Sequence, residues 1–393
     1  MDIFDNRYYR IHRYLLEFIG QWPYQTPKKR RIRWILLYLA VGTVSVVQVV
    51  LKIIQLWDNI DVLTECLIPL GGNCLSILKS SNCIFNGVKM RRLLDLIKKD
   101  WDDMRDEEEI RVLTRYVERG GVISSIYGVC VFGSLLAYMT IPLMPQIMDL
   151  VMPLNETRQR RLLYQVEYFV DEDEYYVYIM IHTYLGSFMS ITVCVGTDTM
   201  LVAYVHHICG IFTIIGNRLE NAMKRADLDS SLCGIIENDR VCGYIANCIN
   251  DHRKAIEFAR LIDASYKLTI FLQVAISMVL ISVTGFQVVA KIDKFDEAVI
   301  FVQSVVAQLV HLFFTSWPSQ MLIDHSRQFQ DSLYFAEWYR FPLRGRRLLN
   351  TAMLRCVKPC KMTAGKFYDL SLQSFAKVVQ TSMSYFTVLV SLR

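Results

Sequence analysis

Several groups of side chains in this sequence have the chemistry of catalysts or metal ligands, but none has the spacing that either role needs. His206 and His207 are adjacent, so on a helix they point about 100° apart and cannot chelate one ion as residues four apart would. Cys356 and Cys360 do lie four apart, but no second pair completes a zinc site. The sequence motifs of phosphate-binding loops, dinucleotide sites, serine hydrolases and metalloproteases are also missing. We therefore predict no enzyme activity, no metal site and no cofactor.

Asp198 is the acidic side chain that best fits a role inside a membrane. It follows an apolar stretch, residues 175–197, which carries no charge apart from the titratable His182. An ionisable residue buried in a membrane normally has a polar or charged partner and a function. The same residue near the cytosolic end of a long helix would simply be hydrated. The sequence alone leaves both interpretations open.

The elements that carry these residues are long apolar segments rather than the units of a soluble fold. Hydrophobic residues make up 53% of the chain and the mean hydropathy is +0.27, as in a membrane protein. Residues 62–88 and 367–392 are more polar. Each would cross a membrane only if protein or water covered one side of the helix. Together with five uncharged segments they predict an all-α membrane protein with seven crossings. Each uncharged segment can span a core of about 30 Å: residues 34–51, 120–148, 175–197, 268–290 and 298–317.

The distribution of basic residues predicts the orientation of these helices. With the N-terminus in the cytosol, the inside segments hold 33 of the 43 Lys and Arg residues and the outside segments hold about six. The seventh crossing then places the C-terminus outside the cell. The sequon Asn155-Glu156-Thr157 falls in an outside loop, so we predict Asn155 as a glycosylation site.

Residues 1–33 form a cytosolic segment before the first crossing. Six of its apolar residues repeat at helical spacing: Phe4, Tyr8, Ile11, Leu15, Phe18 and Trp22. Arginines lie between them, so the pattern predicts an amphipathic helix on the inner membrane face. The basic cluster that follows, residues 28–33, is typical of a determinant of membrane topology, and nucleic-acid binding is not expected.

The C-terminal part of the chain carries three short patterns that occur together in one family. They are Leu312-Phe313 with Trp317-Pro318, Tyr334 with Glu337-Trp338-Tyr339, and Ser384-Tyr385-Phe386 with Val388-Leu389. In order and spacing these patterns resemble the C-terminal region of the insect odorant receptors. The resemblance covers essentially the whole chain in length and number of apolar segments, and it is most specific after His311.

This resemblance implies a subunit of a tetrameric, ligand-gated, nonselective cation channel. Residues 34–321 would form six helices with a ligand pocket in their outer half, 322–366 a cytosolic anchor for subunit contacts, and 367–393 a pore-lining seventh helix. Val388 would be the gate, Leu392 would lie one turn further out, and Ser391 would take part in ion filtering. The subunit contacts would include Trp338, Tyr339, Leu348, Leu349, Met353, Leu354 and Tyr385.

The expected ligand pocket is apolar and adaptable. Aromatic and Met side chains dominate it and few polar groups are available, which suits hydrophobic small molecules bound mainly by burial. The residues expected to line it are Ile68, Leu135, Tyr138, Met139, Tyr178, His182, Leu185, Met189, Met278, Ile281 and Gln308.

The chain resembles the ligand-tuning subunits of the family rather than its shared co-receptor, because its second cytosolic loop has no long insertion. An odorant receptor co-receptor is therefore the expected partner, in a heterotetramer embedded in the lipids of a sensory neuron's dendritic plasma membrane. The patterns YFVDEDEYY, HTY, CGIF and RLE around the fourth crossing resemble a nine-exon group of ants, bees and wasps. That group favours cuticular hydrocarbons or related pheromones as ligands.

Other classes of protein fit the sequence less well. A gustatory receptor-type ligand-gated channel would carry Thr-Tyr and Gln-Phe in its last helix, a pattern that residues 384–393 lack. A metabotropic seven-helix receptor would need its N-terminus outside, against the distribution of basic residues. A transporter would show an inverted repeat or paired broken helices, and none is evident.

Overall fold

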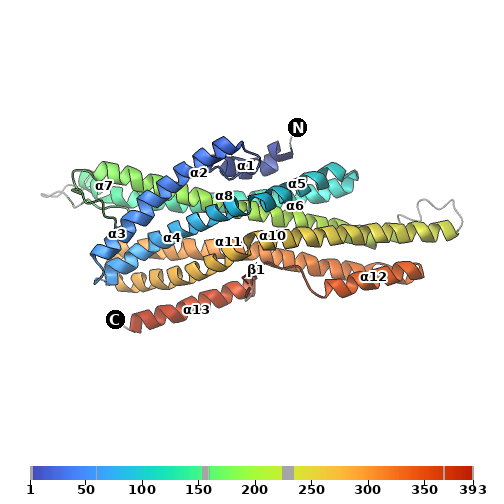
Figure 1. Cartoon of the computed structure of the whole chain (residues 1–393). Coiled ribbons are helices and arrows are strands. Elements are labelled where there is room, and N and C mark those ends of the chain that lie inside the picture. Colours follow the sequence, from blue (N-terminus) through green and yellow to red (C-terminus); the bar gives the residue numbers. More distant parts are fainter. Residues whose placement is uncertain are drawn as a thin grey trace.

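The structure is a computed structural model that describes residues 3–58, 60–152, 158, 160–223, 234–365 and 368–391. Most of these residues are helical (Figure 1). The elements in chain order are η1 (Ile3–Asp5), α1 (Arg7–Phe18), α2 (Pro27–Val41), η2 (Gly42–Val47), α3 (Gln48–Gln55), α4 (Ile60–Phe85), α5 (Gly87–Asp103), α6 (Glu107–Thr140), η3 (Ile141–Leu143), α7 (Met144–Val151), α8 (Tyr176–Glu220), α10 (Gly234–Ala290), α11 (Phe295–Phe335), η4 (Trp338–Arg340), α12 (Leu343–Cys356), β1 (Thr363–Ala364), β2 (Tyr368–Asp369) and α13 (Leu372–Ser391). The predicted helical membrane fold is confirmed, with one small exception: β1 and β2 form a short antiparallel ladder.

Five helical stretches in the described part of the chain are long and apolar enough to cross a membrane: Asp61–Phe85, Glu107–Val151, Tyr176–Glu220, Asp239–Ala290 and Glu297–Phe335. The first and last predicted crossings are built differently. α2, η2 and α3 follow one another directly, as an α-helix interrupted by a π segment of 6 residues. α13 has 20 residues. At about 1.5 Å per residue it matches a hydrocarbon core of about 30 Å.

α8 is the central helix of the bundle (Figure 1). Every residue from Val195 to Gly210 is buried, so this part of the helix is covered around its whole circumference. The covering elements are α1, α2, α4, α6, α10 and α11. A helix that is apolar on all sides is stable only with neighbours on all sides, which explains why the other helices gather around this one.

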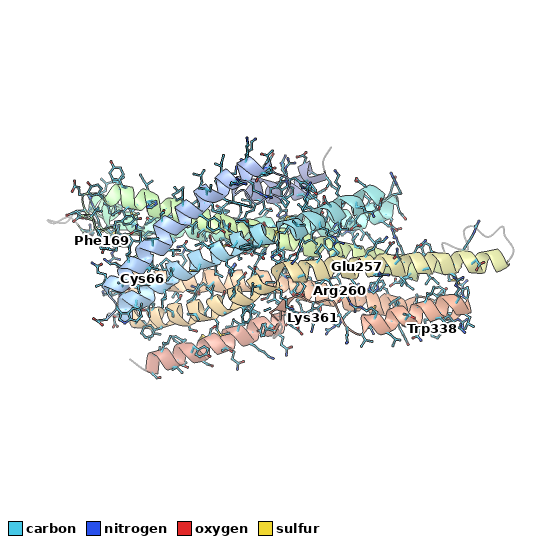
Figure 2. All side chains as sticks on the ribbon, in the orientation of Figure 1. Cys66, Phe169, Glu257, Arg260, Trp338 and Lys361 are labelled. Atoms are coloured by element: carbon cyan, nitrogen blue, oxygen red, sulfur yellow. The ribbon has the colours of Figure 1, made fainter. Side chains whose placement is uncertain are left out.

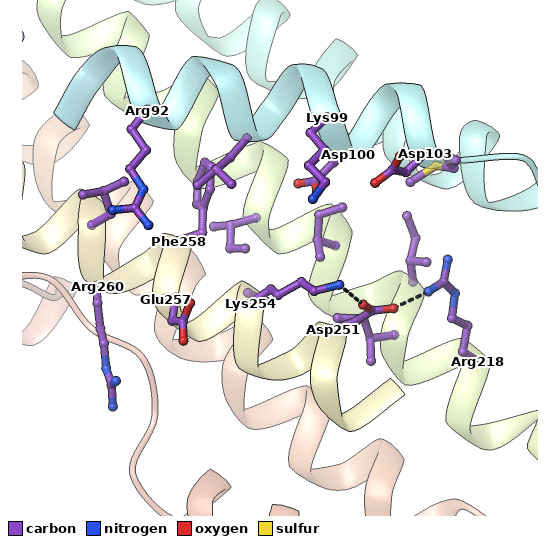
Figure 3. A pocket seen from close by; sticks show the side chains of 18 of the residues that line it. Arg92, Lys99, Asp100, Asp103, Arg218, Asp251, Lys254, Glu257, Phe258 and Arg260 are labelled. Carbon is purple, nitrogen blue, oxygen red and sulfur yellow. Dashed lines mark hydrogen bonds and ion pairs between the residues drawn. The ribbon is translucent and has the colours of Figure 1, made fainter. Parts of the chain in front are cut away.

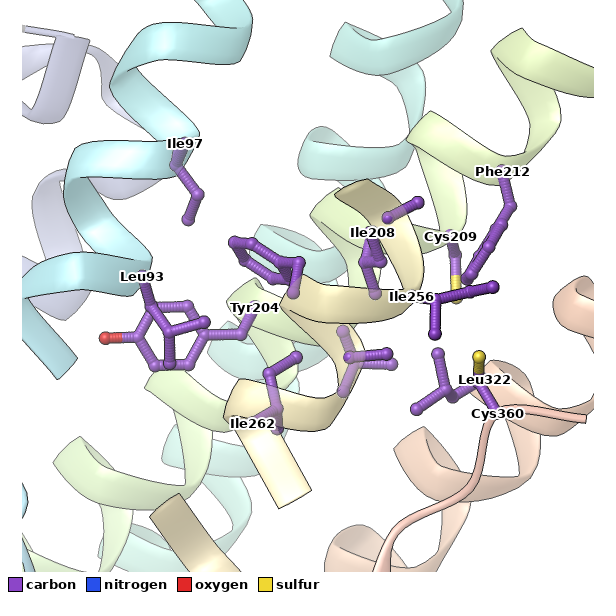
Figure 4. Packing of buried hydrophobic residues seen from close by; sticks show 14 of the residues in the cluster. Leu93, Ile97, Tyr204, Ile208, Cys209, Phe212, Ile256, Ile262, Leu322 and Cys360 are labelled. Carbon is purple, nitrogen blue, oxygen red and sulfur yellow. The ribbon is translucent and has the colours of Figure 1, made fainter. Parts of the chain in front are cut away.

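One large hydrophobic core joins the N-terminal helices to α5, α8, α10, α11 and α12, whereas a separate small cluster lies toward the outer end. Figure 4 shows part of the large core, where side chains from α5, α8, α10 and α11 meet. The buried members drawn there include Leu93, Ile97, Tyr204, Ile256 and Leu322. Each fully buried aliphatic side chain contributes about 1.5–3 kcal/mol. The loop between the second and third crossings is therefore a packed helix, α5, and it extends the bundle beyond the membrane.

The two ends of the molecule carry different elements. α3, α7 and the C-terminal end of α13 lie at one end, and α5 and α12 lie at the other (Figure 1). Cys66 and Phe169 mark the first end, and Trp338 marks the second (Figure 2). We call the end with α7 the outer end. The predicted topology agrees with this arrangement, since it places the 149–174 loop and the C-terminus on the same side.

The N-terminal helix α1 packs on the protein through a face next to the apolar stripe that was predicted to lie on the membrane. Tyr9, His12 and Leu16 are buried against the core, whereas Ile11 and Phe18 are exposed. The helix is present as predicted. Of the other residues in the predicted stripe, Tyr8 and Leu15 are half-buried and Phe4 and Trp22 are buried. Burial lowers the pKa of His12 to about 4, so this side chain is neutral at pH 7.

Gly20 ends the α1 segment in a conformation that favours glycine. Its φ is +74°, and a Cβ built at this position would lie 2.7 Å from the Cβ of Arg33. We expect Gly20→Val to lower the free energy of unfolding by about 2–3 kcal/mol, from backbone strain and displacement of α2. The measurement is the melting temperature of the purified protein in detergent. The control is Gly243→Ala, where no atom lies within 4 Å. Equal melting temperatures for Gly20→Val and the unaltered protein would contradict this prediction.

Candidate functional site

Asp198 is the centre of a buried polar network that joins four helices. Lys79 of α4 donates to its Oδ1 at 2.5 Å, and Tyr127 of α6 donates to its Oδ2 at 3.0 Å. His311 of α11 lies with its Nε2 3.1 Å from the same Oδ2 and 2.9 Å from Lys79 Nζ. The side chains of Lys79 and Asp198 are only 3% and 6% exposed. Of the two interpretations left open by the sequence, the partnered carboxylate is therefore the one observed.

The sequence contained a signal for part of this network. Lys79 and Glu65 are the charged residues within the predicted crossing 62–88, and His311 is the titratable histidine of the block 298–317. Ionisable side chains inside a membrane normally pair with one another, because burying a single unpaired one costs free energy. Tyr127 carried no such signal. Its ring stacks on Phe314 with centroids 3.6 Å apart, which holds the hydroxyl toward Asp198.

A small cavity beside the network extends toward α10. Its volume is about 20 Å³, which is room for one water molecule. Lys79 and Asp198 form one side of it, and Tyr266, Thr269 and Gln273 of α10 form another. The carboxylate thus faces a fifth helix as well as the three that supply its partners.

The predicted pocket residues on α4, α6 and α8 do not all face the same way. Leu135 is buried, and Ile68, Met139 and Met189 are half-buried. The Tyr138 hydroxyl donates to the carbonyl of Leu163 at 2.9 Å, and His182 Nδ1 lies 2.8 Å from the Tyr168 hydroxyl. Tyr178 is 71% exposed and Leu185 is also exposed, so both point away from the bundle.

The other predicted pocket residues lie together on α10 and α11, on the side that faces α13. Ile281 is buried and Met278 packs beside it, in a cluster that includes Val378 of α13. The side-chain amide of Gln308 donates to Thr284 Oγ1 at 3.0 Å. The structure therefore separates the predicted set into one group near α6 and α8 and another near α13.

Gln287 is a buried polar residue in the outer half that the sequence analysis missed. Its amide donates to Thr64 Oγ1 and, at 3.1 Å, to the carbonyl of Asp61. The Oε1 atoms of Gln287 and Gln308 have no hydrogen-bond partner in the described part of the chain. Both can accept a hydrogen bond, for example from a hydroxyl group. In the sequence, each of them was marked only as a polar residue within a mainly apolar segment.

The predicted gate lies on an exposed face of α13. Val388 is 52% exposed, Tyr385 and Ser391 are exposed as well, and Leu392 lies outside the described residues. The opposite face packs on α10 and α11 through Ser374, Val378 and Ser382. The Ser282 hydroxyl of α10 donates to the Ser382 carbonyl at 3.0 Å.

The predicted subunit contacts in residues 322–366 divide into two groups. Leu349 is buried, and Leu348 and Met353 pack on the core. Trp338, Tyr339 and Leu354 are exposed. The first group fixes α12 to this chain, whereas the second group is available for contact with another. The predicted glycosylation site Asn155 lies outside the described residues.

A groove of about 520 Å³ lies between α5, α8 and α10 in the cytosolic half. Three of the charged residues that line it, Arg218, Asp251 and Lys254, are paired with one another (Figure 3). Arg218 and Lys254 each donate to Asp251 at 2.9 Å, and His207 Nε2 lies 2.9 Å from Asp100 Oδ2. These pairs tie the three helices together, so we assign the groove a structural role.

Arg218 also donates to both carboxylate oxygens of the buried Glu109, at 2.8 and 2.6 Å. We expect Arg218→Met to lower the free energy of unfolding by about 3 kcal/mol, because it removes the bidentate partner of a buried carboxylate. The control is Arg253→Met, which removes only an exposed pair with Glu257 and should cost less than about 1 kcal/mol. The stability of each variant is measured as its melting temperature in detergent. Equal losses in Arg218→Met and Arg253→Met would refute the prediction.

Comparison with known proteins adds independent findings. The sequence profile of the family described as "7tm Odorant receptor" matches residues 59–383. Odorant receptor 9a of Drosophila melanogaster is 26% identical over 215 residues, 55% of this chain and 52% of that protein. Odorant receptor 13a of the same species is 28% identical over 226 residues, 54% of this chain and 53% of that protein. The chain thus spans about half the length of these relatives.

Two further comparisons bear on partners and fold. The odorant receptor coreceptor of Aedes aegypti is 22% identical over 149 residues, 37% of this chain and 30% of that protein. The solved structure of the olfactory receptor OR5 from Machilis hrabei in complex with eugenol is similar, with a TM-score of 0.78 and 14% identity. This alignment covers 98% of this chain and 97% of that one. The structural likeness shows that the two chains share their fold.

Proposed function

The chain belongs to the odorant receptor family, and from this we propose that it is the ligand-tuning subunit of an odorant-gated, nonselective cation channel. It is a multi-pass membrane protein of a receptor family, not an enzyme. Residues 34–321 would hold the ligand, 322–366 would contact neighbouring subunits, and 367–393 would line the pore. Residues 1–33 would lie in the cytosol, and the complex would act in the dendritic plasma membrane of a sensory neuron.

The observation that carries this proposal is the exposed polar face of α13. Lys377, Thr381, Ser384, Val388 and Ser391 are all exposed and recur at intervals of three or four residues, so they form one stripe. The hydroxyls of Thr381, Ser384 and Ser391 donate to backbone carbonyls of α13 itself. The charge of Lys377 has no such partner within the helix, and facing it toward lipid would be costly. Water in a pore would cover it if several copies of α13 faced a common axis.

Val388 is the apolar member of this stripe. An apolar ring closes a pore by excluding water, and it opens when its side chains move apart. This supports a gate at Val388, with Leu392 one turn further out and Ser391 beside it. The exposed Trp338, Tyr339, Leu354 and Tyr385 would then be covered by neighbouring subunits.

A hydrophobic small molecule fits the outer half of the bundle best. The side chains there are largely aliphatic, aromatic or Met, and the buried acceptors of Gln287 and Gln308 offer few polar anchors. Machilis hrabei OR5 binds eugenol, a small aromatic molecule, on the same fold. The patterns shared with the nine-exon group favour cuticular hydrocarbons or related pheromones for this chain.

The proposed partner is an odorant receptor co-receptor in a heterotetramer. The similarity to the Aedes aegypti coreceptor is consistent with chains that build a common assembly. The short second cytosolic loop favours the tuning role for this chain.

Whole-cell current tests the proposal directly. Cells would express this chain alone, a co-receptor alone, or both, and would be challenged with long-chain hydrocarbons and smaller volatiles. A fast cation current seen only with both chains is the expected result. A slow rise of second messengers, without current and without need of the co-receptor, would show a metabotropic receptor instead.

A further inference from the structure

We infer that the network of Asp198, Lys79, His311 and Tyr127 positions four helices and transmits ligand binding to the pore helix. This inference rests on the proposed function, and it assigns a role to residues that do not touch ligand or pore. Three lines of geometry support it: the place of the network along the helices, the convergence of its donors, and its link to α13.

The network lies between the expected ligand pocket and the cytosolic core. Asp198 comes 22 residues after Tyr176, the first residue of α8, which is about 33 Å along the helix. Every expected pocket residue on α4, α6, α8 and α11 lies on the outer side of the network member on its own helix. The buried cytosolic side chains of α8, such as Tyr204 and Ile208, lie on the other side. A helix movement that starts at the ligand pocket would therefore displace the network before it displaces the cytosolic core.

A single carboxylate is the shared partner of the other three side chains in this network. Lys79, Tyr127 and His311 come from α4, α6 and α11, and all of them meet Asp198 of α8. Displacing any of these helices along α8 by the length of a hydrogen bond would break a contact to a buried charge. Such contacts are stronger than neutral hydrogen bonds, and the adjacent cavity has room for one water molecule only. The network thus favours discrete arrangements of the four helices over gradual sliding.

The small cavity beside Asp198 connects the network to the pore helix through α10. Thr269 and Gln273 line the cavity. Further along α10, Ser282 donates to the carbonyl of Ser382 in α13, and a Cβ at Gly285 would lie 3.2 Å from the Phe386 ring. α10 is therefore in close contact with both the network and the helix that carries Val388.

The test uses Tyr127→Phe in this chain, co-expressed with an odorant receptor co-receptor and activated by a ligand found for the unaltered pair. The change removes one donor to Asp198 and keeps the ring stacked on Phe314. We expect the half-maximal ligand concentration to rise about tenfold or more, as for one lost hydrogen bond to a charged group, with an unchanged amount of receptor at the cell surface. His311→Gln, on α11, should also raise the half-maximal ligand concentration.

The matched control is Tyr116→Phe. Its hydroxyl joins the same helices in the cytosolic half, with His325 Nε2 and Thr213 Oγ1 each 2.9 Å away. We expect this variant to stay within about twofold of the unaltered receptor. An unchanged half-maximal concentration in Tyr127→Phe, even with less receptor at the surface, would show that the network is only structural. An equal rise in both variants would show a general effect of helix packing and overturn the inference. Absence of current in the unaltered pair would instead refute the proposed channel.

Discussion

Asp198→Leu, with Lys79 left in place, is expected to remove nearly all correctly folded protein from the membrane. The ammonium group of Lys79 would remain buried without its carboxylate. Breaking a buried pair in this way costs about 3–5 kcal/mol, a large part of the 5–15 kcal/mol that typically stabilises a domain. The measurements are surface labelling of intact cells and size-exclusion chromatography of the detergent-solubilised protein.

The double variant Lys79→Leu/Asp198→Leu should recover part of the folded protein, because no charge is then left unpaired. Recovery will be incomplete, since the Tyr127 hydroxyl loses its acceptor at a cost of about 1–3 kcal/mol. Asp331→Leu, an exposed acid on α11, is the control for the change in side-chain type. Normal surface amounts of Asp198→Leu alone would contradict the prediction. So would a double variant that folds no better than the single one.

Val388→Ala is expected to produce a cation current without ligand when the chain is co-expressed with a co-receptor. The substitution removes two methyl groups, about 1.6 kcal/mol of apolar burial in the closed ring. Since about 1.4 kcal/mol is a factor of ten, roughly ten times more ligand-independent current should flow. Whole-cell current per surface receptor is the quantity to compare.

Val390→Ala is the matched control for the gate. It makes the same chemical change two residues away, on the half-buried side of α13. If Val388 forms the constriction, this variant should show the closed-state current of the unaltered protein. Equal leak currents in the two variants would place the effect in helix packing rather than in a gate. No leak in either variant would remove Val388 from the gate.

Much of the fold could be predicted from sequence. The uncharged blocks 268–290 and 298–317 lie within α10 and α11, and the polar segment 62–88 falls mainly on α4. The C-terminal patterns around Trp338 and Tyr385 indicated the family that the comparison confirms. These features are local, because the length and hydrophobicity of a segment determine whether it can cross a bilayer.

The candidate site could be predicted only in part. Asp198 was recognised as unusual, but its partner Lys79 is 119 residues away in the sequence. Tyr178 and Leu185 were placed in the pocket, whereas the structure turns both away from the bundle. Gln287 was missed because a single glutamine in an apolar helix gives no sign of which neighbour it faces.

The sequence by itself therefore determined the class of protein, the positions of most of its long apolar helices and the residue types available on α13. Only the tertiary structure decided which side chains meet, such as Asp198 with its partners, and which face of α1 packs inward. The physical reason is that the sequence pattern does not fix how each helix is rotated about its own axis. Each residue turns a helix by about 100°, and lipid and protein interior are almost equally apolar, so the hydrophobic pattern alone does not distinguish a face that touches lipid from one that touches another helix.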